Sequence, residues 1–280
     1  FMKISIAVPS YNYYQYIESC LKSILEQTYS NFEVLICDGG SNDGSLEIIQ
    51  KYCKLDNRFS LISESDSGQS NALNFAFSIA EGEIFYFLNS DDILTNKNAF
   101  QMAIDSFKSY PKVSIISFDG HYVDSIGTII KKINLRYHPF DNIDNMKNRT
   151  AVIQPATFWK RKVYEDIKFK EKFEYSFDSV FFYQAYLLFN WLEVNESICG
   201  YRWHNLNKSG EISYKRVKEL SNFEILKFGE YSYRVIYLKI IAKLFLKIEQ
   251  KSYLPNYFKI VVRLFVNSFS FLTVYKFPSI

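Results

Sequence analysis

A chain of 280 residues, 48% of them apolar, can bury a sizeable core, and this composition excludes a globally disordered protein. The formal net charge is +3, but residues 231–280 hold eight Lys and Arg side chains against one acid, and the remainder carries a net charge of −4. The positive charge therefore belongs to the C-terminal tail, and a nucleic-acid-binding function for that tail leaves its apolar faces unexplained, so no nucleic-acid partner is expected.

Strand and helix signals alternate over the first hundred residues. Apolar runs rich in β-branched and aromatic residues predict strands at 3–11, 32–38, 59–63 and 83–92, and helical periodicity predicts helices at 14–28, 41–53 and 67–82. Strands separated by such helices imply right-handed βαβ units and a parallel sheet with helices on both faces. In such sheets ligands bind beyond the carboxyl ends of the strands, and the polar clusters PSYN, DGGSND and NSDD all follow predicted strands there.

The rest of the chain divides into a mixed middle and a helical tail. Residues 113–203 show strand, hairpin and helix signals without a linker, so we expect one domain over 2–212 and an amphipathic helical region over 213–280. Four cysteines without CxxC spacing, and no signal peptide before the first strand, predict a cytoplasmic protein with free thiols.

Basic residues recur every fourth position in the tail, at Lys239, Lys243, Lys247 and Lys251, with apolar residues between them. Two interpretations stay open: a helix pair packed on the body with a solvated charged face, or a helix pair on the anionic inner face of the cytoplasmic membrane. No stretch reaches about 18 uncharged apolar residues, so a membrane-spanning helix is not expected.

The motifs of the first hundred residues resemble those of one family. SIAVPSYN, VLICDGGSNDGS, SESDSGQSN and FYFLNSDD, in this order and spacing, resemble the family 2 glycosyltransferases with the GT-A fold, over residues 3–210. Among the branches of this family, the motifs DGGS and LNSDD most resemble one that serves bacterial surface-polysaccharide synthesis. The resemblance implies a Rossmann-like α/β fold with a mostly parallel sheet flanked by helices and a C-terminal helical appendage. It also implies an inverting, metal-dependent transfer from a nucleotide sugar, with a UDP-sugar favoured, to a glycan or lipid-linked glycan.

The resemblance makes NSDD the metal-binding loop of the DxD type. Asp91 is the main candidate ligand for Mn²⁺ or Mg²⁺, Asp92 assists or orients it, and Asn89 replaces the first acid of the commonest pattern. His204 is a further candidate ligand, with a structural histidine as the alternative. A hard cation bridging two phosphates needs only one or two protein carboxylates. Without the resemblance, the two carboxylates read as a solvated turn.

The same resemblance implies donor-binding residues in the other clusters. Pro9, Ser10, Tyr11 and Asn12 would cradle the nucleoside, and Asp38 would contact the base or ribose.

Further donor contacts are implied by the shorter motif matches. Gly39 stands where the family often carries a second acid, so the sequence does not indicate which nucleotide base is bound. A tight turn explains this glycine equally. Asp66 and Ser90 match positions near the nucleotide, and Asp66 is otherwise a loop acid. Arg202 and Lys208, in YRWHNLNK, would balance the charge of the departing diphosphate.

The reaction needs a base to take the acceptor's proton. FEYSFDSVFF aligns Asp178 with the family's base at a helix start, while Val180 replaces the second acid of the pattern; a simple helix cap is the alternative. QPATFWKR matches an acceptor-facing segment through Gln154 and Trp159, with a core role for Trp159 left open.

Two rival functions remain. A nucleotidyltransferase shares a similar sheet and metal, but PSYNYYQY lacks its Gly-rich basic loop. A catalytically weak nucleotide-sugar-binding partner in a glycan assembly complex is favoured by Gly39, Asn89 and Val180.

Overall fold

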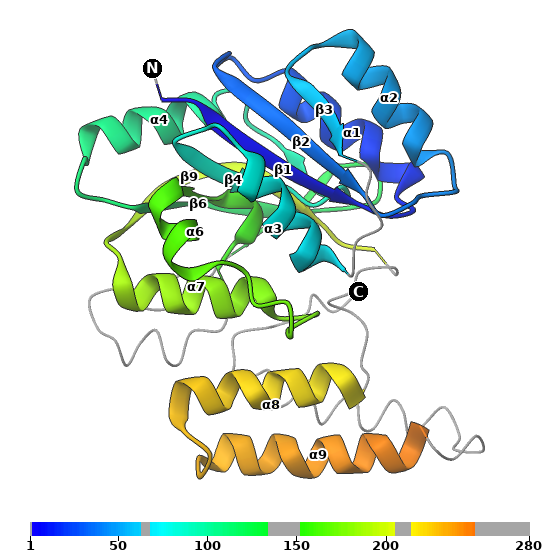
Figure 1. Cartoon of the computed structure of the whole chain (residues 1–280), viewed down its shortest axis with the longest axis vertical. Helices are drawn as coiled ribbons and strands as arrows, with labels where there is room; N and C mark the ends of the chain where they lie inside the picture. Colours follow the sequence, from blue (N-terminus) through cyan, green and yellow to red (C-terminus); the bar gives the residue numbers. More distant parts are fainter. Residues whose placement is uncertain (1, 63–67, 134–151, 205–213, 250–280) are drawn as a thin grey trace. The chain divides into compact units, whose positions relative to one another are not determined.

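The computed structural model describes residues 2–62, 68–133, 152–204 and 214–249 (Figure 1). These residues belong to two compact units, which we describe separately. The first comprises the described parts of 1–134, 152–171 and 181–204. The second comprises 172–180 and the described helices within 205–280.

The first unit is built on one mixed sheet, whose described strands run in the order β3-β2-β1-β4-β8-β6-β9-β5, with β7 paired to β6. The strands are β1 (Ile4–Ser10), β2 (Phe32–Asp38), β3 (Phe59–Ile62), β4 (Ile84–Phe87), β5 (Ile93–Leu94), β6 (Ile115–Val123), β7 (Ile129–Lys132), β8 (Thr157–Lys160) and β9 (Trp191–Arg202). The first four pair in parallel, as their sequence predicts. Strand β8 is antiparallel to both β4 and β6, while β6 and β9 are parallel.

Helices cover both faces of this sheet (Figure 1). They are α1 (Tyr14–Leu25), α2 (Ser45–Leu55), α3 (Gln69–Ile79), α4 (Ala99–Ser109), α6 (Arg161–Ile167) and α7 (Phe177–Leu188), of which α7 begins in the second unit. Side chains of β4 alternate between the faces: Phe85 stacks on Phe77 of α3 with ring centroids 4.7 Å apart, and Tyr86 packs edge-on against Phe100 of α4. The predicted α/β architecture with helices on two faces is therefore confirmed.

The second unit contains two paired helices, α8 (Tyr214–Phe228) and α9 (Tyr233–Glu249). Gly229, with φ of 79°, ends α8 because its backbone N–H turns back to the carbonyl of Ile225. Val217, Leu238 and Ile241 form the core between them. Within the described part of the chain, no helix is long and apolar enough to cross a membrane.

Candidate functional site

Three polar loops meet at the carboxyl edge of the parallel strands. Ser10 at the end of β1 lies opposite Asp38 at the end of β2, and the N–H of Gly39 donates to the carbonyl of Ser10 at 2.9 Å. The N–H of Leu88, just past β4, donates to the carbonyl of Ala7 at 3.0 Å. The backbone thus brings together the PSYN, DGGS and NSDD segments, because parallel strands end at the same edge.

Asp38 organises its own loop. Its buried carboxylate accepts hydrogen bonds from the N–H of Gly40 at 3.1 Å and from the N–H and hydroxyl of Ser41 at 2.8 and 2.6 Å. Gly40 has a φ of 87°, which favours glycine. The DGGS turn expected from the sequence is therefore present, and its acid is already committed to the turn.

The PSYN loop is tied to the DGGS loop. Asn12, in the left-handed region at φ 57°, donates its N–H to the Ser41 hydroxyl at 2.9 Å and accepts the N–H of Asn42 on its side-chain oxygen at 2.9 Å. Pro9 is buried, whereas Tyr11 is 59% exposed. The loop therefore leaves one aromatic face accessible at the sheet edge.

Two buried hydroxyls at this edge have no hydrogen-bond partner among the described residues. They are the Oγ atoms of Ser10 and Ser90, whose residues are 5% and 1% exposed. A buried polar atom without a partner costs about 1–3 kcal/mol. A ligand with hydrogen-bonding groups would remove that cost.

Asp91 and His204 face each other across the NSDD loop. The Oδ2 atom of Asp91 lies 3.0 Å from Nε2 of His204, and both side chains are almost buried. The imidazole lies against the ring of Tyr16, with centroids 4.6 Å apart, and near Tyr13. Burial, with the charge of Asp91 adding to it, raises the pKa of Tyr13.

Asp92 points away from this pair and into the protein. Its Oδ1 accepts the backbone N–H of Arg202 at 2.8 Å, and Oδ2 lies 3.5 Å from the amide nitrogen of Asn89. Burial raises the pKa of Asp92 well above its usual range, and the neighbouring charge of Asp91 raises it further. Asp91 is therefore the carboxylate better placed for a ligand.

Arg202 is committed to the protein backbone. The residue is 1% exposed, and its guanidinium donates to the carbonyl of Asp91 at 2.6 Å, to those of Asp124 and Ser125 at 3.0 and 2.7 Å, and to the Ser19 hydroxyl at 3.0 Å. These bonds point its N–H groups at the NSDD loop and the β6–β7 turn. The sequence predicts direct contact between Arg202 and a diphosphate. In the structure the same N–H groups bind the carbonyls that hold the loop.

A network of amides surrounds Asn89. Its side-chain oxygen accepts from Gln69 Nε2 at 2.7 Å, and its nitrogen donates to Gln154 Oε1 at 3.2 Å. Gln154 is itself buried and donates to the carbonyl of Phe87 at 2.6 Å. Gln154 therefore braces the end of β4, and the side chain of Asn89 is held between the amides of Gln69 and Gln154.

Trp159 lies in the hydrophobic core, which is one of the two roles left open by the sequence. Its side chain is fully buried and packs against aromatic rings of α3 and α7, including Phe77, Phe181 and Phe182. A buried ring presents no face to a sugar. This corrects the acceptor-facing role for Trp159.

Asp178 lies in the first turn of α7, in the second unit. It is half-buried, and its Oδ1 accepts the N–H of Ser179 at 2.6 Å. Burial raises the pKa of the Asp178 carboxyl, against the lowering effect of the hydrogen bonds from Ser179. A helix N-terminus lowers the pKa of a carboxylate, and desolvation outweighs that effect at Asp178.

Two predicted donor residues, Asp66 and Lys208, lie outside the described residues. Among the residues that are described, no group of three or more His, Cys, Asp or Glu side chains is placed to hold a metal ion by itself. Asp91 and His204 form a pair of suitable donors. The sequence reasoning missed Gln69, whose place three residues after Asp66 in the SDSGQSN motif was the available signal.

The family described as Glycosyl transferase family 2 has a model that matches residues 5–168. Hyaluronan synthase of Pasteurella multocida is 30% identical over 228 residues, covering 81% of this chain and 21% of that protein. Chondroitin synthase of Escherichia coli is 33% identical over 127 residues, covering 45% of this chain and 18% of that protein. An uncharacterized glycosyltransferase of Nostoc sp. is 32% identical over 126 residues, covering 45% of this chain and 38% of that protein. The chain thus spans less than two fifths of the length of these relatives.

Solved structures share the fold at low identity. Staphylococcus aureus TarS in complex with UDP-GlcNAc has a TM-score of 0.64 at 21% identity, covering 88% of this chain and 72% of that chain. The mannosyltransferase PcManGT of Pyrobaculum calidifontis, in complex with GDP-Man and Mn²⁺, has a TM-score of 0.60 at 17% identity, covering 98% of this chain and 81% of that chain.

Proposed function

The chain belongs to glycosyl transferase family 2 and has the GT-A fold, and from this premise we propose that it catalyses an inverting sugar transfer from a nucleotide sugar, with a UDP-sugar favoured. The acceptor is a glycan or a lipid-linked glycan in surface-polysaccharide synthesis. The observation that carries the proposal is the meeting of three polar loops at the sheet edge, with the Asp91–His204 pair and two unpartnered buried hydroxyls, those of Ser10 and Ser90.

The relatives support the substrate class. Two are named for chondroitin and hyaluronan synthesis, and a further relative from Bacillus subtilis for teichuronic acid biosynthesis. The solved neighbours hold UDP-GlcNAc or GDP-Man. The names of the relatives support a polysaccharide product, and the ligands of the solved neighbours support a nucleotide-diphosphate sugar as donor.

The donor set fits a divalent ion shared with a diphosphate. Asp91 supplies a carboxylate oxygen and His204 an imidazole nitrogen, 3.0 Å apart. Mn²⁺ accepts both ligand types, and ions of this class complete their shell with phosphate oxygens and water. When bound, the ion would neutralise charge that builds on the leaving diphosphate. Asp92, Asn89 and Arg202 hold the loop that presents Asp91, and Arg202 adds positive charge beneath it.

Asp178 is the proposed base. It takes the proton of the acceptor hydroxyl as that oxygen bonds to the anomeric carbon and the bond from that carbon to the diphosphate oxygen breaks. A raised pKa suits this role, because a more basic carboxylate accepts the proton more readily. The proposed donor contacts of Asp66 and Lys208 rest on the motif match.

The test is release of free nucleotide from UDP-, GDP- and dTDP-sugars with Mn²⁺, with the variant Asp91→Ala. We expect one donor to turn over, and turnover to be lost with EDTA and in Asp91→Ala. Asp105→Ala, at an exposed acid of α4, is the matched control and should keep full activity. Equal, EDTA-resistant turnover in Asp91→Ala would refute the metal site. Donor binding by thermal shift without turnover, even with added acceptors, would favour the weak binding partner instead.

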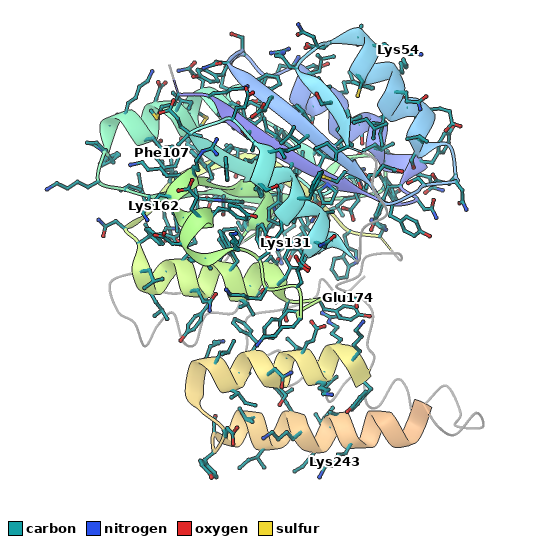
Figure 2. All side chains as sticks on the ribbon, in the orientation of Figure 1. Lys54, Phe107, Lys131, Lys162, Glu174 and Lys243 are labelled. Carbon is teal, nitrogen blue, oxygen red and sulfur yellow. The ribbon has the colours of Figure 1, made fainter. Side chains whose placement is uncertain are left out.

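A second proposal concerns the tail: we propose peripheral contact with an anionic membrane, on the cytoplasmic inner face. Ile236 and Ile240 are 49% and 54% exposed, and Lys239 and Lys243 of the same helix, α9, are also exposed. Lys243 is labelled in Figure 2. Apolar and basic side chains on one helix favour an anionic lipid surface.

The measurement is co-sedimentation with phosphatidylserine-containing vesicles and with neutral vesicles. The double variant K239E/K243E should lose binding to the anionic vesicles, while K54E/K162E, at exposed lysines labelled in Figure 2, should keep it. Equal loss in both variants would show a net-charge effect and refute a specific α9 surface.

A further inference from the structure

A buried acid of α8 lies outside the donor site. Glu219 is 6% exposed, and its carboxylate accepts the backbone N–H groups of Glu174 and Tyr175, each at 2.8 Å. The hydroxyl of Ser176 lies 3.4 Å from the same carboxylate. All of these residues belong to the second unit, so the contacts are internal to it. One carboxylate therefore binds three consecutive residues.

Those three residues lead directly into α7. The carbonyl of Ser176 accepts the N–H of Val180 at 3.0 Å, which is the first hydrogen bond of that helix. Asp178 stands in the same turn, two residues after Ser176. Fixing the backbone at 174–176 therefore fixes where α7 starts and where its first turn presents Asp178.

The contact requires a carboxylate. Each oxygen of Glu219 accepts from a different backbone N–H, and an ionised carboxylate only accepts hydrogen bonds. A glutamine would replace one acceptor by an NH₂ group, which would face a backbone N–H donor. Lys215, one turn earlier on α8, adds an ion pair with Glu174, but both side chains are well exposed and contribute little. Glu174 is labelled in Figure 2.

We propose that Glu219 is a positioning residue for the reaction: it orients the first turn of α7, and with it Asp178, through the backbone of residues 174–176. This inference rests on the proposed role of Asp178 as the base. Through Glu219, α8 contributes to catalysis and is not only an appendage. Donor binding and the placement of the base then depend on different segments of the chain.

The test uses the full chain with Glu219→Gln and a matched control, Glu224→Gln. Glu224 is also buried on α8, at 4% exposed, and pairs with Lys227 of the same helix. Both variants remove one buried carboxylate from the same helix. Hydrogen–deuterium exchange of the peptide covering 173–180 reads the contact directly, without any substrate. Nucleotide release, with water as acceptor, from the donor that turns over gives kcat and KM.

We expect faster exchange at 174 and 175 in Glu219→Gln but not in Glu224→Gln. We also expect kcat to fall by about 10–100-fold with KM for the donor unchanged, because a base displaced by about 1 Å loses rate without losing donor contacts. Wild-type protection at 174–175 in Glu219→Gln, or a loss of kcat equal to that of Glu224→Gln, would overturn the inference. Asp178→Asn distinguishes the two proposals: unchanged turnover in that variant refutes the base itself, whereas loss there with a normal Glu219→Gln refutes the positioning alone.

Discussion

Replacing Arg202 by methionine tests whether this side chain holds the NSDD loop. The guanidinium donates to three backbone carbonyls, those of Asp91, Asp124 and Ser125. Its Cζ atom lies 5.0 Å from the ring centroid of Tyr16. Methionine fills a similar volume but donates no hydrogen bond. Arg202→Met would therefore leave three carbonyls without their donor and remove a buried positive charge near two carboxylates.

The expected loss of unfolding free energy follows from the hydrogen bonds that the variant removes. Hydrogen bonds to charged groups contribute about 1.5–3 kcal/mol each, but neighbours relax and water enters, so the losses do not add fully. Breaking a buried charged network by removing one partner costs about 3–5 kcal/mol. For a unit of this size each kcal/mol lowers Tm by about 2–4 °C, which predicts a fall of about 6–20 °C.

Thermal unfolding followed by circular dichroism measures the change. The matched control is Lys51→Met, because Lys51 pairs with Glu18 where both side chains are exposed, at 67% and 54%, and such pairs contribute about 0–1 kcal/mol. Equal Tm values for the two variants would refute the structural role. A stable Arg202→Met that has lost donor turnover would instead support direct contact with the diphosphate.

Two further predictions concern the core and the base. Trp159→Ala should lower the free energy of unfolding by about 3–5 kcal/mol, measured from the urea midpoint. The control Tyr110→Ala, at a side chain 54% exposed, should change it by less than about 0.5 kcal/mol. A Trp159→Ala variant that keeps its stability but binds the acceptor more weakly would restore the acceptor role. Burial raises the pKa of Asp178, so the base becomes protonated, and kcat/KM falls, as pH drops through a value above the ordinary aspartate pKa of about 3.9. A pH–rate profile checks this, and an acid limb that is unchanged in Asp178→Asn would contradict it.

Local patterns in the sequence predict most of the first four strands and the edge where their loops meet. The apolar run Ile84–Phe87 becomes the buried strand β4, although Ser90, Asp91 and Asp92 after it are buried as well. This works because strand periodicity and the parallel βαβ connection are properties of short segments. The antiparallel pairings of β8 depend instead on partners far along the chain, such as Phe85 with Trp159, and short-range patterns do not specify them.

The roles of charged residues were harder to predict than their places. Arg202 and His204 stand in one motif, YRWH, yet the imidazole faces the Asp91 carboxylate while the guanidinium binds carbonyls of residues 78 and 111 positions away. A motif gives the residue types but not the acceptors that surround them. Trp159 shows the same limit, since QPATFWKR does not reveal that five aromatic rings enclose it.

Arg202 and Glu219 suggest a common principle for how this chain supports its chemistry. Each is a buried charge whose hydrogen bonds go mainly to backbone groups of a loop: carbonyls for the guanidinium, N–H groups for the carboxylate. Such bonds fix the course of the backbone whatever side chains the loop carries. The groups proposed to meet the substrates, Asp91 and Asp178, then do not have to fix the course of the backbone themselves. On this argument, variants of the two buried charges should lower rate more than donor affinity, and variants of Asp91 should lower both.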